Sequence, residues 1–516
     1  AHILTNDKFF SKCLEAPSNF SHIRLTVDEP EDIKNITSVL RRLNNDHLLN
    51  AFDYVDCYVK LMDEGLLLKP QKRNQGMTEN NTNKLWKRAK KVLPGGNSLL
   101  SKRPEMFLPN KWPTYFSHTN GCYVTSIEGE SYLDMSIMGV GTNSLGYSDP
   151  FVDSKVIEVV KKGNLSTLNC FEEIELAERL VQINPWAEMV RFTRAGGEAN
   201  AMMARICRAA SGKSKIAVCG YHGWHDWYLA LNLEGRDDLK DHLLPGLSSV
   251  GVPEGLSGSV VPFNYNDYSR LEEIVLDEEV GTIYMEVERS SPPKDDFLQK
   301  VRALCNRKGI ILAFDECTSG FRECFGGIFN KHKVNPDICV FGKALGNGYA
   351  INAVVGTKNV MDNGQSTFMS STFWTERIGP TAALATLKRM EETKSWETIS
   401  LNGEMISSTI QQLANTHSVK VEISGLKPII IWKILSNTPK KELKYKTYLT
   451  QEMLKSNILA SGLIYTSIHH SNEVTQRFFH CLDQIFKTIS SCEQEDLNID
   501  NLLETDVAHT TFTRLI

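Results

Sequence analysis

Four short polar or glycine-containing stretches have residue types that could do chemistry together. Three of them directly follow apolar runs that are typical of buried β-strands, and the fourth opens a predicted helix. In chain order they are Ala195-Gly196-Gly197, Gly220-Tyr221-His222-Gly223, Asp315-Glu316 and Gly342-Lys343. The last three directly follow the apolar runs at 216–219, 310–314 and 338–341. Because ligands bind beyond the carboxyl ends of strands in an open parallel sheet, we expect the four features to converge on one site.

The side chains of this group have complementary chemistry. The amine of Lys343 could form a Schiff base with a carbonyl compound. Asp315 could keep a pyridinium ring protonated, which makes such a ring an electron sink. Backbone N–H groups of the Gly196-Gly197 pair could bind a phosphate at the start of a helix, and the Tyr221 ring could stack on a planar ring. Together they favour a phosphorylated pyridine aldehyde as the ligand.

Each feature has an ordinary structural explanation when it is taken alone. An aspartate after a strand more often caps a helix, and a lysine there is usually solvated. Turns need glycine in any case, and a tyrosine after a strand more often packs against its neighbours. The prediction therefore depends on the four features occurring together.

The elements that must position these residues follow from alternating apolar runs and helical periods beyond about residue 84. Runs typical of strands lie at 216–219, 282–285, 310–314, 338–341 and 353–355. Between two of them a helix is predicted, with Phe297, Val301 and Leu304 on one face, Asp296 as its cap and Gly309 at its end. Short strands separated by helices predict an α/β fold with a mainly parallel sheet covered on both faces.

With these motifs in place, residues 84–516 resemble the class III (subgroup II) aminotransferases of fold type I, and most of all their glutamate-1-semialdehyde aminomutase-like branch found with surface-polysaccharide genes. The matching stretches run from Leu93-Pro94-Gly95-Gly96 near the start to residues 509–515 at the end. Between them the matches are residues 220–226, 314–322, 341–348 and 370–373. The resemblance implies a large domain with a mainly parallel, seven-stranded type of sheet, a smaller C-terminal α/β domain, and pyridoxal 5′-phosphate as the cofactor.

The resemblance also implies roles for individual residues. Lys343 is similar to the Schiff-base lysine that moves protons, and Asp315 to the residue that binds the pyridine nitrogen. Tyr221 would stack on the ring with His222 beside it, Gly196 and Gly197 would hold the phosphate, and Thr372 would reach the phosphate of a neighbouring subunit in a homodimer. The remaining implied residues are Glu286, which is followed by Val287 where the family has proline, and the substrate-lining candidates Ser98, Gly139, Val140 and Arg322.

One position departs from the family pattern. The family usually has serine or threonine where Gly197 stands, and that hydroxyl contacts the phosphate. Losing one hydrogen bond to a charged group costs about 1.5–3 kcal/mol unless something replaces it. We therefore expect phosphate binding to depend more on backbone N–H groups and on Thr372.

A second resemblance concerns the first 45 residues. The stretch from Ser21 to Asp32 is similar to the C-terminal end of polysaccharide-biosynthesis cytidylyltransferases, in which the aspartate matching Asp28 can contribute to a metal site. The nucleotide-binding loop of that family is absent here, so we expect no nucleotidyl transfer, and Asp28 more simply opens a helix. The two resemblances together suggest a fusion, or a truncated fusion.

These patterns divide the chain into five parts. Residues 1–70 are predicted as a cytidylyltransferase-like remnant with a helix, and the polar stretch 71–83 as a linker. Residues 84–145 are predicted as an N-terminal arm, 146–385 as the large cofactor-binding domain and 386–516 as the small C-terminal domain.

Composition excludes several other classes of protein. The 516 residues carry a formal net charge of −5, which argues against nucleic acid or an anionic membrane as partner, and no apolar run is long enough to span a bilayer. Twelve scattered cysteines fit a reduced, cytoplasmic protein. We expect no metal site, since His222 with His225 has no third ligand at useful spacing, and the pair His469-His470 is predicted to lie at the surface or to face the substrate.

Three functions remain open. The first is transfer of an amino group from a small-molecule donor to a keto or aldehyde acceptor, in surface-polysaccharide or related biosynthesis. The second is an aminomutase of the glutamate-1-semialdehyde type. The third is a catalytically weak domain that serves as a dimerising scaffold.

Overall fold

The computed structural model describes residues 37–39, 41–42, 57, 60–61, 82–233, 247–288 and 290–510. The chain divides into two compact units, residues 1–80 and residues 81–516. The cytidylyltransferase-like stretch at 21–32 and most of the predicted linker at 71–83 lie outside the described residues. The helix α3 begins at Thr82, so the last two residues assigned to the linker are helical.

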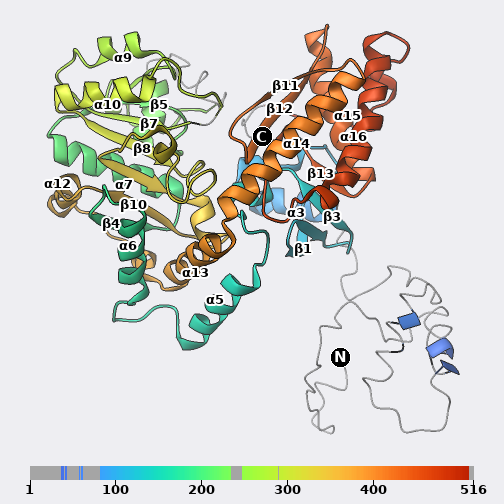
Figure 1. Cartoon of the computed structure of the whole chain (residues 1–516), viewed down its shortest axis with the longest axis horizontal. Coiled ribbons are helices and arrows are strands. Elements are labelled where there is room, and N and C mark those ends of the chain that lie inside the picture. Colours follow the sequence, from blue (N-terminus) through green and yellow to red (C-terminus); the bar gives the residue numbers. More distant parts are fainter. Residues whose placement is uncertain are drawn as a thin grey trace. The chain divides into compact units, whose positions relative to one another are not determined.

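A seven-stranded sheet forms the centre of the large domain (Figure 1). Its strands are β4 (Met189–Thr193), β5 (Lys215–Cys219), β6 (Val260–Pro262), β7 (Val280–Glu286), β8 (Ile311–Glu316), β9 (Ile338–Phe341) and β10 (Asn352–Gly356). Their spatial order is β4-β10-β9-β8-β7-β5-β6. The strand β10 is antiparallel to both of its neighbours, β4 and β9. The other neighbouring pairs, β9-β8, β8-β7, β7-β5 and β5-β6, are parallel. The predicted α/β class with a mainly parallel sheet is confirmed.

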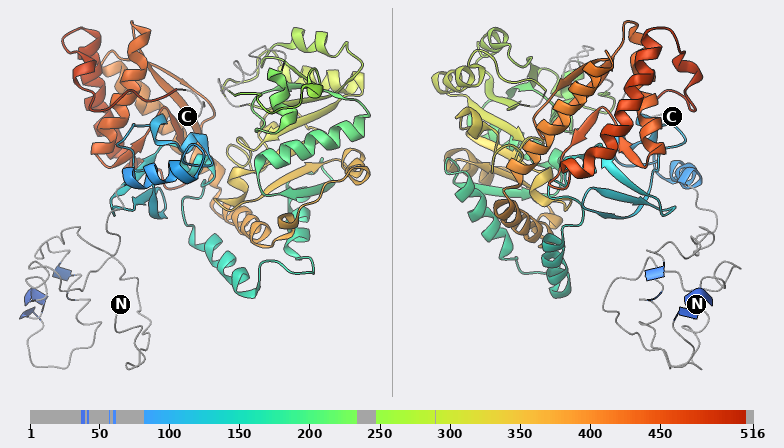
Figure 2. Two further views of the ribbon diagram at one scale, coloured as in Figure 1. Left: turned by 180° about the vertical axis from the view of Figure 1, so that it is seen from behind. Right: turned by 45° about the vertical axis from the view of Figure 1, so that its right-hand side comes forward.

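Successive side chains of each strand point to opposite faces of this sheet. Helices cover both faces, so both sets of side chains are buried. In β5 and β8, Val218 and Ala313 join one core cluster with residues of α7 (Gly196–Ser211). Their chain neighbours Ala217 and Leu312 join the cluster on the other face, which contains residues of α10 (Phe297–Lys308). Figures 1 and 2 show the helices on either side of the sheet.

The helix α10 shows how local signals set an element. Phe297, Val301 and Leu304 are buried on one face, and Gly309 ends the helix at φ 63°, as predicted. The predicted cap is wrong: Asp296 precedes the helix but has φ 56° and makes no side-chain hydrogen bond to its first turn. A capping side chain needs an extended backbone, which the left-handed conformation of Asp296 does not provide.

Two smaller sheets complete the second unit. One has the order β1-β2-β3-β13 and joins the N-terminal arm to the C-terminal region, and the other has the order β11-β12-β14. Their strands are β1 (Phe116–Asn120), β2 (Tyr123–Ser126), β3 (Ser131–Met135), β11 (Lys420–Ser424), β12 (Ile429–Leu435), β13 (Ile458–Ala460) and β14 (Leu463–Tyr465). The parallel pairing of β3 with β13 is the only parallel contact in these two sheets among the described residues.

The other helices cover these sheets and connect the strands. They are α3 (Thr82–Val92), α4 (Met138–Gly141), α5 (Pro150–Lys162), α6 (Glu172–Ile183), α8 (Asp226–Leu229), α9 (Tyr268–Ile274), α11 (Phe329–His332), α12 (Lys358–Met361), α13 (Ile378–Thr393), α14 (Ser395–Thr416), α15 (Glu442–Lys455) and α16 (Asn472–Glu493). Two short 3₁₀ helices matter below, η5 (Lys343–Gly346) and η7 (Thr372–Thr375). Across the described ranges no helix is long and apolar enough to cross a membrane, and the cysteines there form no disulfide.

Glu316, the last residue of β8, gives a prediction about stability. The side chain is fully buried, and burial raises its pKa to about 7 although the Ser319 hydroxyl and the Phe329 N–H donate to it. Between the ordinary value of 4.5 and about 7 the folded state holds a proton that the unfolded chain releases. The free energy of unfolding therefore falls as pH rises through that window.

We expect Glu316→Gln, which mimics the protonated side chain, to remove on the order of 2–3 kcal/mol of this pH dependence. Urea unfolding at pH 5 and pH 8 would measure it, with the exposed Glu254→Gln as control. The same difference between wild type and Glu316→Gln at both pH values would contradict the assignment.

Candidate active site

The carboxyl ends of β5, β7, β8 and β9 lie side by side at one edge of the large sheet. Asp315 in β8 is the register partner of Glu286 in β7 on one side and of Val340 in β9 on the other. Tyr221 and His222 follow β5, and Lys343 follows β9. Sheet order therefore brings together residues that are far apart in the sequence.

Asp315 is almost fully buried and accepts hydrogen bonds from three groups. Its Oδ2 lies 2.8 Å from His222 Nδ1 and 2.9 Å from Asn200 Nδ2, and its Oδ1 accepts the Cys317 N–H at 3.0 Å. The Tyr284 hydroxyl donates to the Asn200 carbonyl oxygen at 2.6 Å, which orients the amide so that its NH₂ faces Asp315. The carboxylate is thus held by the helix α7, by the loop after β5 and by the backbone directly after β8.

These contacts decide the charge of Asp315. Burial by itself would raise the pKa of this carboxyl. The hydrogen bond and charge of His222, the Cys317 N–H and the charge of Lys343 act in the opposite direction and together hold the pKa below its ordinary value. Asp315 is therefore ionised at neutral pH inside the protein, which is the state that can bind a pyridinium N–H.

His222 is fully buried between two acceptors. Its Nδ1 faces Asp315 Oδ2, and its Nε2 lies 3.0 Å from the Cys219 carbonyl oxygen. Both partners are oxygen atoms that can accept a hydrogen bond from a ring N–H. His222 is therefore held in place by Asp315 on one side and by the β5 backbone on the other.

Lys343 lies at the start of η5 with a left-handed backbone, φ 41°. Such a conformation costs a non-glycine residue about 1–3 kcal/mol. The half-buried side chain donates from Nζ to the Thr318 hydroxyl at 2.7 Å. Thr318, three residues after Asp315 in the chain, therefore holds the amine. The charge of Lys343 acts on Asp315 and helps to lower its pKa.

Glu286 and Tyr221 meet through the backbone. The Tyr221 N–H donates to Glu286 Oε2 at 3.2 Å. Gly220 has φ 106°, and a β-carbon there would lie 2.7 Å from the same carboxylate oxygen. Glycine at 220 is thus required for the turn that carries the half-buried Tyr221 ring to the end of β5.

The N-terminus of α7 lies beside this group. Glu198 Oε2 accepts from the backbone N–H groups of Arg194 and Ala195, each at 3.0 Å. Within the described ranges the N–H groups of Gly196 and Gly197 have no protein acceptor. Free N–H groups at the positive end of a helix dipole suit an anion such as a phosphate.

The space that a side chain at position 197 would occupy is filled by the ring of His225. A β-carbon there would lie 2.9 Å from both Cε1 and Nδ1 of His225, so the imidazole fills that space. His225 Nδ1 is buried and has no hydrogen-bond partner in the described structure. Burial lowers the pKa of His225, although the nearby carboxylates of Glu198 and Asp226 act to raise it.

Thr372 lies exposed at the start of η7. This segment is joined to the start of α7, because Trp374 Nε1 donates to Glu198 Oε2 at 3.3 Å and the Arg194 guanidinium donates to the Trp374 carbonyl at 2.9 Å. The neighbouring side chains of Phe368 and Phe373 are 84% and 67% exposed.

The substrate candidates fall into two groups. Gly139 and Val140 both have left-handed φ values, 65° and 63°, and Arg322 donates to the carbonyl of the next residue, Gly141. Arg322 itself is buried, and its Nε donates to the Thr318 carbonyl at 2.6 Å, which links it to the Lys343 contact. Ser98 is exposed, and no hydrogen bond joins it to the other candidates within the described ranges.

Sequence reasoning missed four residues of this site: Asn200, Tyr284, Thr318 and His225. The periods of helices and strands could have indicated two of them. Asn200 lies one turn after Gly196 in α7, and Tyr284 is two residues before Glu286 in β7 and so lies on the same face of the sheet. Thr318 and His225 carry no such signal, since loops place them.

The donors and acceptors present fit a phosphorylated pyridine aldehyde. The ionised, buried Asp315 suits a ring N–H, the Lys343 amine suits an aldehyde carbon, and the N–H groups at Gly196 and Gly197 suit a phosphate. The described residues contain no group of three His, Cys, Asp or Glu side chains that could hold a metal ion. The predicted surface position is wrong for His470, which is fully buried: its Nδ1 accepts the Ser467 N–H, and its Nε2 lies 2.9 Å from the Asp134 carbonyl oxygen.

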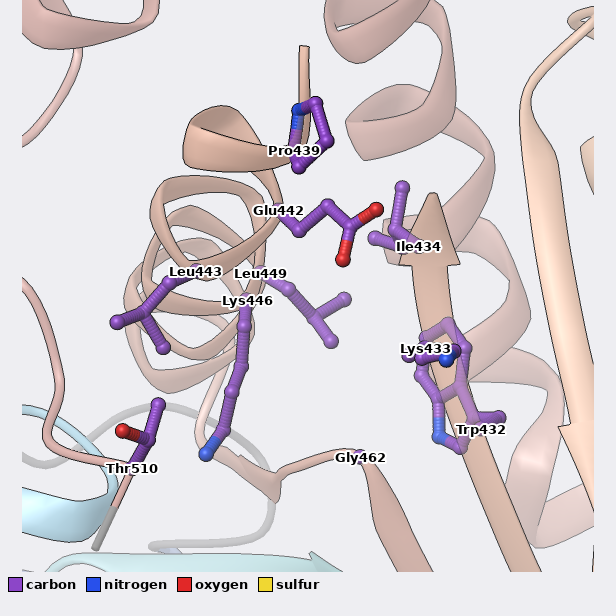
Figure 3. A pocket seen from close by; sticks show the side chains of 10 residues that line it. All are labelled: Trp432, Lys433, Ile434, Pro439, Glu442, Leu443, Lys446, Leu449, Gly462 and Thr510. Carbon is purple, nitrogen blue, oxygen red and sulfur yellow. The ribbon is translucent and has the colours of Figure 1, made fainter. Parts of the chain in front are cut away.

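A cavity of about 260 Å³ lies away from these residues, in the small domain between β12 and α15. Figure 3 shows Lys446 and Trp432 on opposite walls of it. Its lining is Trp432, Lys433, Ile434, Pro439, Glu442, Leu443, Lys446, Leu449, Gly462 and Thr510. None of the candidate site residues contributes to it.

The sequence and the fold of this chain are similar to those of known proteins. The sequence model of the aminotransferase class-III family matches residues 109–482. A 3-aminobutyryl-CoA aminotransferase of Cloacimonas acidaminovorans is 31% identical over 351 residues, which are 66% of this chain and 80% of the relative. A glutamate-1-semialdehyde 2,1-aminomutase of Methanocaldococcus jannaschii is 27% identical over 425 residues, 78% of this chain and 97% of the relative.

Solved structures agree in fold. The FumI protein of Sphingopyxis sp. MTA144, solved in its PLP internal aldimine form, superposes with a TM-score of 0.72 at 20% identity and covers 82% of this chain and 99% of its own. An omega-transaminase from Sphaerobacter thermophilus gives 0.69 at 22% identity, with 80% and 98% covered. At these identities the likeness establishes the fold alone.

The Asp315–His222 contact gives a prediction that needs no ligand. We expect His222→Ala to lower the free energy of unfolding by about 3–5 kcal/mol, because it leaves a buried carboxylate without its main partner. The exposed His118→Ala is the control and is expected to change it by no more than about 0.5 kcal/mol. Urea denaturation of the ligand-free protein measures both, and equal small losses would show that His222 does not support the charge.

Proposed function

Because the chain belongs to the aminotransferase class-III family, whose enzymes depend on pyridoxal 5′-phosphate, we propose that it transfers an amino group from a small-molecule donor to a keto or aldehyde acceptor. One observation carries the proposal: a buried, ionised Asp315 and the amine of Lys343 lie at the ends of adjacent parallel strands. These are the two groups that the cofactor needs at its ring nitrogen and at its aldehyde.

The residues then have the following roles. The bound cofactor supplies a protonated pyridine ring that accepts electrons from the substrate carbon that loses a proton. With the cofactor bound, Lys343 Nζ would be the amine that holds its aldehyde carbon and would carry a proton between carbons. Thr318 holds this amine in reach, and Asp315 keeps the ring nitrogen protonated.

The other contacts position the cofactor. The N–H groups of Gly196 and Gly197 bind the phosphate at the positive end of α7. Tyr221 packs on the ring, and Glu286 fixes the Tyr221 backbone. His222 and Asn200 hold the Asp315 carboxylate in place and so act on the cofactor through it.

An aminomutase is the second candidate, because relatives named glutamate-1-semialdehyde 2,1-aminomutase match over up to 80% of this chain. Such an enzyme moves an amine within one molecule and needs no external donor in each cycle. A place in surface-polysaccharide biosynthesis is supported by the resemblance of residues 21–32 to a cytidylyltransferase terminus. A carbonyl intermediate of that biosynthesis would be the acceptor.

The assignment of Lys343 is tested by the cofactor's visible absorbance. We expect wild type to show a band that borohydride bleaches, with the cofactor then fixed to the peptide that contains residue 343. Lys343→Ala should lose both the band and the fixed adduct. Lys333→Ala is a matched control, because Lys333 is an exposed lysine with a similar left-handed backbone, φ 54°. A wild-type band retained in Lys343→Ala would refute the assignment.

The donor requirement then separates the functions. An aminotransferase converts the bound cofactor to its amine form with a donor amino acid alone and needs that donor in stoichiometric amount for each product. An aminomutase forms product from one substrate without it. A scaffold protein would neither bind the cofactor in stoichiometric amount nor convert it.

We also propose a homodimer in which Thr372 of one subunit binds the phosphate of the other. The exposed Phe368 and Phe373 beside Thr372 support an interface at this segment. Loss of a hydrogen bond to a charged group predicts that Thr372→Val weakens cofactor binding on the order of 10- to 100-fold.

Mixed dimers test which subunit Thr372 serves. When Lys343→Ala and Thr372→Val chains are combined, a partner-serving Thr372 leaves one fully intact site for each dimer, which binds cofactor as wild type does. A Thr372 that serves its own subunit leaves no intact site, and the weak affinity of the Thr372→Val protein persists.

A further inference from the structure

The start of α7 combines two features that no assigned role explains. One is the space over Gly197, where a β-carbon would lie 2.9 Å from the His225 ring. The other is His225 Nδ1 itself, a buried polar atom with no partner in the described structure. Buried polar atoms are almost always hydrogen-bonded, so an orphaned one beside a ligand site indicates a ligand contact.

We propose that His225 donates a hydrogen bond from Nδ1 to the phosphate of the cofactor, in place of the hydroxyl that Gly197 cannot supply. The inference rests on the proposed function, because it needs the phosphate to lie at the start of α7. It goes beyond that function by assigning the binding of this group to a residue of a neighbouring loop.

The loop is built to bring the imidazole there. Gly223 has φ 100°, and a β-carbon on it would lie 3.0 Å from the Gly197 Cα, so two glycines let the loop and the helix touch through their backbones. The next residues turn into α8, and the His225 carbonyl accepts the N–H groups of Tyr228 and Leu229 at 2.9 Å and 3.1 Å. The backbone of His225 is thereby fixed while its ring stays over Gly197.

The chemistry of the ring matches the task. A neutral imidazole carries one N–H, and with the hydrogen on Nδ1 it is a donor with the reach of a serine hydroxyl. The N–H groups of Gly196 and Gly197 belong to the same helix start that the His225 ring contacts, so one anion at that start is within the reach we propose for all three donors. No proton needs to move, and no bond forms or breaks.

Substitutions separate this role from packing. His225→Ala removes the donor, His225→Asn keeps an N–H near the Nδ1 position, and His225→Gln places it near Nε2 instead. Gly197→Ser restores the hydroxyl but collides with the ring, so it should bind well only in the double variant with His225→Ala. The last comparison is the sharpest, because each single change harms binding and their combination repairs it.

The measurement is the dissociation constant of pyridoxal 5′-phosphate, and of pyridoxal without the phosphate, from the apo protein followed by tryptophan fluorescence. We expect His225→Ala and Gly197→Ser to weaken phosphate-ester binding on the order of 10-fold or more. His225→Asn and the double variant should remain within about threefold of wild type. Pyridoxal binding should change little in His225→Ala, which also shows that the variant is folded.

The outcomes distinguish the two proposals. If wild type binds neither compound, the proposed function fails, and the role of His225 falls with it. If wild type binds pyridoxal 5′-phosphate but His225→Ala binds it equally well, the role of His225 alone is refuted. An equal loss for pyridoxal and its phosphate ester would also refute it, because that pattern indicates a general packing role.

Discussion

The negative charge of Asp315 is the constraint on which the rest of the site depends. A carboxylate in the interior of a sheet is unstable unless donors surround it, and here they come from α7, from the loop after β5 and from the β8 backbone. Each of these hydrogen bonds forms only if the element that carries the donor is correctly placed against β8. The arrangement of helix, loop and strand around this carboxylate is therefore tied to the charge that the chemistry needs.

The same constraint explains why the site sits at this edge of the sheet. The strand interiors are apolar on both faces and cannot hold a charge, whereas at the carboxyl ends helix α7 and the loops offer N–H groups and side chains. Glu316, the neighbour of Asp315, shows the alternative. It faces the other side of β8, where its donors are the Ser319 hydroxyl and backbone N–H groups. No cation among the described residues lowers its pKa, and burial together with the charge of Asp315 raises that pKa to about 7. Two adjacent carboxyl groups thus differ in charge because their neighbours differ.

Much of this arrangement follows from the sequence. The apolar runs locate β5, β7, β8, β9 and β10, and the polar residues that follow them indicate the site. The reversed direction of β10 does not follow, because a short buried run reads the same in either direction. The conformation of Asp296 is set by the chain entering α10 rather than by its own preference for capping. The contact of Asn200 with Tyr284 depends on how α7 packs on the sheet, which one sequence does not state.

The pairing of β3 with β13 has a consequence for the order in which the chain can fold. All strands of the seven-stranded sheet lie between Met189 and Gly356, so the residues around Asp315 can assemble while later parts of the chain are still being synthesised. The strand β3 can pair with β2 early, but its other edge stays unpaired until its parallel partner, which begins at Ile458, has been synthesised. Domains that emerge first generally fold first. The four-stranded sheet is therefore completed only after every strand of the large sheet has been synthesised.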